Sequence, residues 1–157
     1  MPKNIDNSVQ MDAVDRKIVA ALQRDGRLPV TNLAAKVGLS KTPCQVRLKR
    51  LQQAGVILGF RAIVDARKLG MDHIAFVEVR LADTRERALQ EFNAAVRQIA
   101  EVEECHMIAA SFDYLLKVRT PHIRRYREVL GEKISSLPHV ASTSTFVAMD
   151  TIFDAGP

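Results

Sequence analysis

The stretch from residue 31 to residue 54 constrains the fold most, because it has the pattern of two short helices separated by a tight turn. Thr31 can cap the first helix, Gly38 can adopt the positive φ that ends it, and Ser40 can cap the second. A short helix, a turn with glycine and a basic second helix are the order of a helix-turn-helix motif. The sequence therefore predicts that residues 40–54 read DNA.

The second helix of this motif has one apolar face. Cys44, Leu48 and Leu51 have i, i+4 and i+7 spacing, so they should face the core. The opposite face then carries polar and basic side chains and no acidic residue. The predicted DNA-binding residues are Ser40, Lys41, Thr42, Gln45, Val46, Arg47, Lys49 and Arg50.

Their chemistry suggests different roles on DNA. Gln45 can bond an adenine edge, Val46 can contact a thymine methyl group, and Lys41 or Lys49 can reach guanine or phosphate. Arg47 and Arg50 are assigned to the phosphate backbone, where contacts position a protein without specifying the sequence.

The charge of the chain is concentrated in its N-terminal part. Residues 1–65 carry 11 lysines and arginines against 5 aspartates and no glutamate, whereas residues 66–157 carry 12 against 13 acidic residues. This polarity is typical of a DNA-binding head joined to a neutral assembly or sensing domain.

The remaining segments suggest the domain boundaries. We expect a flexible arm over residues 1–10, a winged helix-turn-helix domain over 11–65, a hinge over 66–72 and a second domain over 73–157. Asp12 can cap a first helix that runs from about Ala13 to Arg24. The β-rich run at 55–65 is expected to form a wing strand or a strand that links the domains.

The second domain is predicted to have the order β-α-β-β-α-β, the ferredoxin-like pattern of an α+β sandwich. Its strands are expected at 73–81, 102–108, 114–119 and 140–152, with both helices on one face of the sheet. The other face would expose Ile74, Phe76, Leu115 and Phe146. A bare apolar sheet face predicts self-association, at least into a homodimer.

The chain resembles the Lrp/AsnC (feast/famine) family of amino-acid-responsive transcription regulators over roughly residues 11–150. The resemblance is carried by the segments 11–18, 22–27, 33–34, 37–40, 42–44, 47–51, 55–57, 102–106, 112–116 and 137–140. The segments 106–114 and 135–149 also look like the branch of the family that activates proline catabolism. The resemblance implies dimers built through the sheet faces and assemblies of dimers such as an octamer.

The resemblance also implies that a small amino acid binds at the turn between the second and third strands, at contacts between dimers. In this chain the turn is 109–114, and the implied effector-binding residues are Ala110, Ser111, Asp113 and Tyr114. Ala110 stands where the family usually has glycine, and alanine penalises positive φ and close backbone approach. Asp113 can pair with the ammonium group of the effector or can act as a turn former.

Other chemistry has little support in the sequence. The four histidines lack metal-ligand spacing, Cys44 and Cys105 are expected to be buried inert thiols, and no catalytic pattern or cofactor motif stands out, so we expect neither an enzyme nor a metal. The acidic residues Glu101, Glu103 and Glu104 are expected on a solvated surface, or against a basic patch of another subunit.

The predicted function is sequence-specific regulation of transcription by binding double-stranded DNA, with a small amino acid as effector. Two alternatives stay open, an architectural protein that compacts DNA with little sequence preference and a regulatory subunit of an enzyme. No apolar run approaches the ~18 residues of a membrane span and the start of the chain lacks a signal-peptide core, so a cytoplasmic protein is expected.

Overall fold

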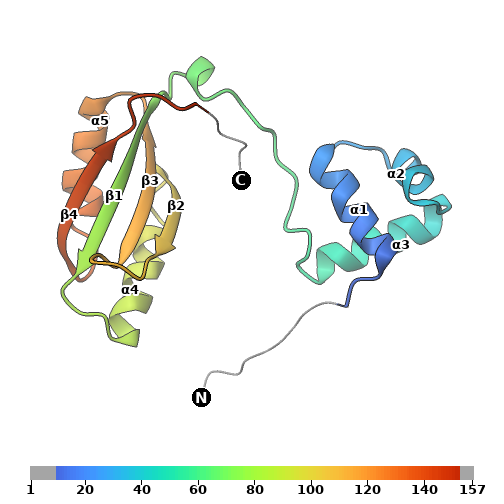
Figure 1. The fold of residues 1–157 in the computed structure, drawn as a ribbon, viewed down its shortest axis with the longest axis horizontal. Helices are drawn as coiled ribbons and strands as arrows, with labels where there is room; N and C mark the ends of the chain where they lie inside the picture. The colour runs from blue at the N-terminus through green and yellow to red at the C-terminus, as the bar shows by residue number, and fades with distance from the viewer. Residues whose placement is uncertain (1–9, 153–157) are drawn as a thin grey trace. The chain divides into compact units, whose positions relative to one another are not determined.

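A computed structural model describes residues 10–152, and the chain divides into two compact units, the first ending at Ile63 and the second beginning at Val64 (Figure 1). The predicted arm lies, apart from Gln10, outside the described residues. Each unit has a hydrophobic core of its own.

The described part of the first unit, from residue 10 onward, consists of three helices, α1 (Ala13–Arg24), α2 (Val30–Val37) and α3 (Lys41–Gln53). The predicted cap of α1 is confirmed, because Asp12 Oδ1 accepts a hydrogen bond of 2.8 Å from the Asp15 N–H. The bond is reciprocal, since Asp15 Oδ2 accepts one of 3.1 Å from the Asp12 N–H. This capping box satisfies two N–H groups that the helix itself leaves unpaired.

The turn between α2 and α3 is confirmed at Gly38, which has a φ of 76°. The predicted cap at Thr31 is wrong, because α2 begins one residue earlier, after Pro29, so that Thr31 lies inside its first turn. Ser40 occupies the N-cap position of α3, but its side chain makes no capping hydrogen bond. The three helices pack around a core formed by Ile18, Leu22, Leu33, Ala34, Val37, Cys44 and Leu51.

The predicted wing strand is wrong for this single chain. Residues 55–65 form no strand. Two apolar side chains of this run, Leu58 and Ile63, expose 95% and 79% of their surface. The β-branched and apolar residues of this run favour an extended backbone, but a strand also needs a neighbouring backbone to bond with. No such neighbour is present among the described residues.

The predicted hinge at 66–72 contains a 3₁₀ turn, η1 (Arg67–Leu69), which ends at Gly70 with a φ of 70°. It is bonded to the chain that follows the last strand. Arg67 Nη2 donates to Asp150 Oδ1 and to the Thr151 carbonyl, at 3.2 Å each. The segment is therefore held by the second unit.

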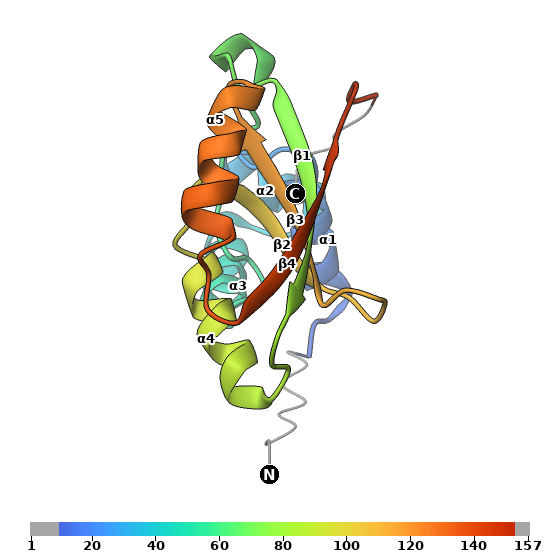
Figure 2. The same cartoon turned by 90° about the vertical axis from the view of Figure 1, so that its left-hand side faces the viewer.

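The second unit confirms the ferredoxin-like pattern. Its elements are β1 (His73–Leu81), α4 (Glu86–Val96), β2 (Val102–Met107), β3 (Tyr114–Thr120), α5 (Ile123–Glu128), a π-helical turn η2 (Val129–Ile134) and β4 (Val140–Val147). The strands are antiparallel in the order β2-β3-β1-β4, and both helices cover one face of the sheet (Figure 2). The last strand ends at Val147, short of the predicted Ile152.

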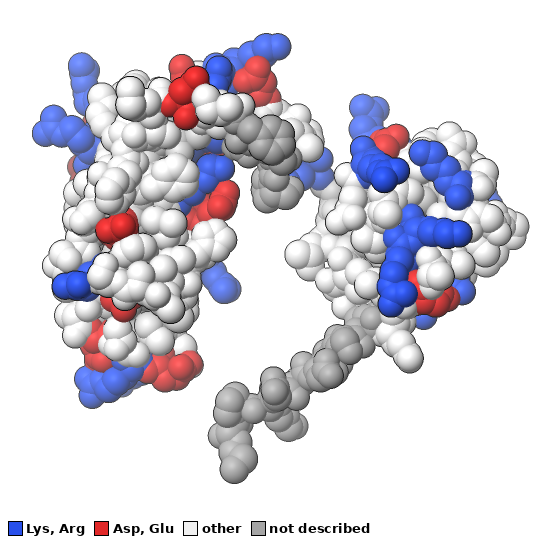
Figure 3. Space-filling view, viewed as in Figure 1, with Lys and Arg blue, Asp and Glu red and all other residues white. Residues whose placement is uncertain are grey.

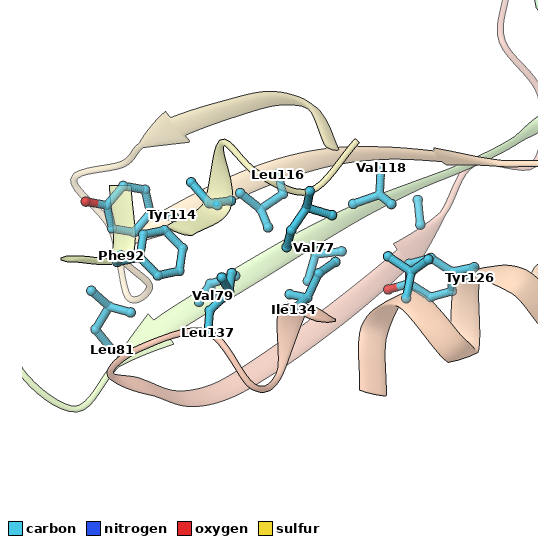
Figure 4. Packing of buried hydrophobic residues seen from close by; sticks show 14 residues of the cluster. Val77, Val79, Leu81, Phe92, Tyr114, Leu116, Val118, Tyr126, Ile134 and Leu137 are labelled. Atoms are coloured by element: carbon cyan, nitrogen blue, oxygen red, sulfur yellow. The ribbon is translucent and has the colours of Figure 1, made fainter. Parts of the chain in front are cut away.

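The core of this unit lies between the sheet and the helices (Figure 4). Val77 pairs with Leu116 on one side and with Thr145 on the other. The rings of Phe92 and Tyr114 pack with their centroids 4.4 Å apart. This packing fixes which face of the sheet each strand residue occupies.

The other face of the sheet bears Phe76 and Phe146, which are cross-strand partners and expose 37% and 54% of their surface. Leu115 is half-buried, whereas Ile74, also predicted here, is buried. The two edges of the sheet differ in charge. β2 carries Glu103 and Glu104, whereas the edge strand β4 has no charged residue at all.

Candidate nucleic-acid interface

The outward face of α3 is exposed along its length. Cys44 and Leu51 are fully buried and Leu48 is half-buried, as predicted. The residues turned away from them are exposed, and they are Lys41, Thr42, Gln45, Val46, Lys49 and Gln53. This face offers amide, hydroxyl, ammonium and apolar groups in one stripe, and no carboxylate.

The charge of the first unit is strongly positive. Lys and Arg side chains dominate the face of it that Figure 3 shows, with few acidic groups among them. Between residues 10 and 63 the only carboxylates are Asp12, Asp15 and Asp25. Such a surface attracts the phosphate backbone of nucleic acid over long range.

Two of these carboxylates contact arginines of α3. Arg47 Nη1 lies 2.5 Å from Asp12 Oδ2 and 2.9 Å from Asp15 Oδ1. Arg50 Nη2 bonds the second carboxylate oxygen, Oδ2, of Asp15. The Asp15 side chain is fully buried, so this network of two acids and two arginines ties α1 to α3.

The pKa values reflect the network. The Asp15 N–H and the Arg47 guanidinium lower the pKa of Asp12 to about 2. Burial raises the pKa of Asp15, but hydrogen bonds from Arg47, the Asp12 N–H and Arg50 outweigh it, so that this pKa lies below its ordinary value. The hydrogen bonds to Asp12 and Asp15 in turn raise the pKa of Arg47. Both carboxylates therefore stay ionised at neutral pH.

Sequence reasoning assigned Arg47 and Arg50 to DNA phosphates and did not foresee these partners. The network spans 35 residues of sequence between Asp15 and Arg50. The one signal in the sequence was an acidic pair, Asp12 and Asp15, at helical spacing in a segment otherwise almost free of acid.

The residues of the implied effector turn do not converge on one point. Ala110 and Ser111 are exposed, and the Ser111 carbonyl accepts hydrogen bonds from Arg80 Nε and Nη2 at 3.1 and 2.6 Å. Asp113 Oδ2 accepts one of 2.7 Å from the Leu81 N–H. Tyr114 points into the core and is only 2% exposed (Figure 4).

Two of these positions change the expectation from sequence. The φ of Ala110 is not positive, so the conformational penalty on alanine does not arise in this turn. One carboxylate oxygen of Asp113 accepts from the Leu81 N–H at the end of β1, which ties the turn to that strand, and the second oxygen is not engaged in that bond. Sequence reasoning missed Arg80, which holds the backbone of the turn.

The acidic cluster is paired with basic side chains of the same chain, and it lies at the surface, with Glu103 exposed and Glu101 and Glu104 half-buried. Glu101 bonds Lys133 and Arg125, at 2.8 Å each. Glu103 bonds Arg119, and Glu104 bonds His106 and Lys117. Cys105, expected to be buried, is exposed, because it lies on the edge strand β2, whereas Cys44 is buried as expected.

Residues 10–152 contain no group of three or more His, Cys, Asp or Glu side chains placed to hold a metal ion. No helix in this part of the chain is long and apolar enough to cross a membrane.

A helix-turn-helix unit with a basic recognition face, joined to a β-α-β-β-α-β unit, defines a DNA-binding protein with a separate regulatory domain. Residues 11–52 match the AsnC-type helix-turn-helix domain, and residues 74–157 match the Lrp/AsnC ligand-binding domain. The chain belongs to the Lrp/AsnC family of transcription regulators, and it is not an enzyme.

Two relatives carry the name proline dehydrogenase transcriptional activator. The one from Rhizobium radiobacter is 66% identical over 146 residues, which are 93% of this chain and 94% of the relative. The one from Rhodobacter capsulatus is 55% identical over 144 residues, 92% of this chain and 94% of the relative. A transcriptional regulator of Neisseria meningitidis, solved as a complex with L-Met, superposes with a TM-score of 0.82 at 28% identity, over 92% of this chain and 94% of that one.

Proposed function

We propose that this chain activates transcription of a proline dehydrogenase gene by binding a specific DNA site near its promoter. The observation that carries the proposal is the exposed, acid-free face of α3 in a helix-turn-helix unit. The names of the two relatives, at 66% and 55% identity over nearly the whole chain, supply the target gene.

On this proposal α3 enters the major groove. Gln45 contacts an adenine edge and Val46 a thymine methyl group, because an amide and an apolar side chain suit these two groups. Lys41 and Lys49 contact guanine or phosphate, and Ser40 and Thr42 lie at the same exposed end of the helix.

The proposal includes a free amino acid as effector at the turn 109–114. Its support is the match to a ligand-binding domain and the L-Met complex of the Neisseria meningitidis regulator. Asp113, with one carboxylate oxygen outside its bond to Leu81, is the candidate partner of the ammonium group, and Ala110 and Ser111 supply exposed backbone. Because the proposed target gene encodes an enzyme that acts on proline, proline is the first amino acid to test.

We also propose that two chains pair through the open face of the sheet, where Phe76, Phe146 and Leu115 leave apolar surface uncovered. A dimer places two recognition helices on one symmetric site. Further assembly, into an octamer or a similar oligomer, belongs to the same proposal.

Footprinting of the purified chain on DNA upstream of the proline dehydrogenase gene tests the DNA-binding part. A defined protected site is expected, and even protection of this DNA and random DNA would overturn it in favour of an architectural protein. Gln45→Ala should relax base preference at one position of the site, worth about 1 to 3 kcal/mol. Gln23→Ala, an exposed glutamine on α1, is the matched control and should leave the preference unchanged.

Thermal unfolding of the full chain with free amino acids tests the effector. Proline at a hundred times its dissociation constant should stabilise the folded chain by about 2.7 kcal/mol. No stabilisation by proline, methionine or any other protein amino acid would overturn this part of the proposal.

A further inference from the structure

We propose that Asp15 is a positioning residue for DNA binding: it holds Arg47 and Arg50 of α3 against α1, so that the lysines of α3 meet the phosphates in their place. The inference rests on the proposed function, because it concerns how the same helix contacts DNA. It assigns to the two arginines a role opposite to the one that their charge and position on the helix suggest.

The geometry accounts for both oxygens of the Asp15 carboxylate. Oδ1 accepts from Arg47 at 2.9 Å, and Oδ2 accepts from Arg50 and from the Asp12 N–H. Arg47 Nη1 also reaches Asp12 Oδ2 at 2.5 Å. Each guanidinium is thus directed toward the N-terminus of α1.

Burial makes this arrangement hard to exchange for binding to DNA. The Asp15 side chain is 0% exposed, and an ionised carboxylate without water needs positive partners. If Arg47 and Arg50 both turned to phosphates, Asp15 would be left buried, charged and unpaired. The attraction of each arginine to a phosphate would therefore be offset by the free-energy cost of the unpaired carboxylate inside the protein.

The network is also electrically neutral, since it contains two carboxylates and two guanidinium groups. Lys41 and Lys49 are different, because they are exposed on the outward face and neither makes an ion pair with any residue between 10 and 152. The electrostatic part of DNA binding by α3 should therefore come from these lysines.

The salt dependence of binding separates the two kinds of residue. Log affinity falls as log salt concentration rises, and each phosphate that a side chain neutralises adds about 0.9 to the magnitude of this negative slope. A residue that only supports the fold changes the affinity at every salt concentration and leaves the slope alone.

The test measures the magnitude of this slope for the full chain on a random-sequence DNA duplex, with circular dichroism to verify folding. Arg50→Ala should keep the wild-type slope, and the matched control Lys49→Ala should lower it by about 0.9. Asp15→Asn, which keeps the shape and removes the charge, should raise the slope by about 0.9 for each arginine that it releases.

Two results would overturn the inference. One is a drop of about 0.9 in the slope of Arg50→Ala, because Arg50 would then neutralise a phosphate in the complex. Another is a folded Asp15→Asn chain with an unchanged slope. If Asp15→Asn does not fold, Arg50→Ala decides alone, since Arg47 still pairs with Asp15 in that variant. An unchanged slope for Lys49→Ala would instead overturn the proposed DNA face, and with it the assignment of the phosphates to the lysines.

Discussion

Replacing Tyr114 by phenylalanine is expected to stabilise the second unit, whereas the same replacement at Tyr126 should destabilise it. Both rings are only 2% exposed and belong to one core (Figure 4). The Tyr126 hydroxyl lies 2.5 Å from Thr145 Oγ1 and forms a hydrogen bond with it. The Tyr114 hydroxyl has no hydrogen-bond partner of normal geometry among the described residues, although the Asn93 side chain lies close enough to lower its pKa.

The magnitudes follow from this difference. A buried hydroxyl without a partner costs about 1 to 3 kcal/mol, so its removal in Tyr114→Phe should raise the free energy of unfolding by about 1 kcal/mol or more. Tyr126→Phe loses one satisfied hydrogen bond and should lower it by about 1 kcal/mol. In thermal unfolding, a change of about 1 kcal/mol shifts the midpoint temperature of a domain of this size by roughly 4 to 8 °C.

Tyrosine fluorescence during urea unfolding is a suitable assay. The chain has two tyrosines and no tryptophan, and both tyrosines lie in the second unit, so the signal reports that unit alone. Each variant keeps one tyrosine as the reporter. A loss of about 1 kcal/mol or more in Tyr114→Phe would refute the reasoning, because it would mean that the Tyr114 hydroxyl has a partner.

Three further predictions concern charge and backbone. Burial raises the pKa of both tyrosines above the ordinary value of 10.0. Their contribution to the free energy of unfolding is therefore complete below pH 10.0 and is lost as the pH rises through the folded-state pKa values. Urea unfolding measured at a series of alkaline pH values should show a smaller loss of stability in Tyr114→Phe than in wild type. The pKa of Asp12 is lowered from 3.8 to about 2, so its contribution to stability is present above pH 3.8 and is lost as the pH falls toward 2. Acid unfolding followed by circular dichroism should depend less on pH in Asp12→Asn than in wild type. His139 has a φ of 65°, and His139→Gly should be more stable in urea than His139→Ala by about 1 kcal/mol, since both lose the bond to Glu91 and glycine alone tolerates this φ.

Local patterns in the sequence predicted most of the secondary structure. The apolar spacing of α1 and the acid at Asp12 predicted that helix and its cap, because both depend on residues within one or two turns. The alternation in β1 likewise predicted which residues face the core. The same period-two alternation applies to β3 and predicts the position of Tyr114. If Leu115 lies on the open face, Tyr114 must lie on the other, inside the core.

Features that depend on distant segments were not predictable in the same way. The outer flank of α3 predicted phosphate contacts for Arg50, whereas its ion pair with Asp15 depends on how α1 crosses α3 and has no signal within the helix. The apolar run at 55–65 suggested a strand, but whether it pairs depends on another backbone. In the candidate effector turn, sequence supplied the residues and could not show that Arg80 and Leu81 bond its backbone and its aspartate.

The unequal edges of the sheet have a practical consequence for handling this protein. β2 carries two glutamates at its edge of the sheet, whereas β4 presents eight uncharged residues and, among the described residues, pairs with β1 alone. An uncharged edge strand is a template onto which another chain can add a strand. In concentrated solution, misassembly should therefore begin at β4, and the first sign of ageing in a stored sample should be growth of sheet content from that edge.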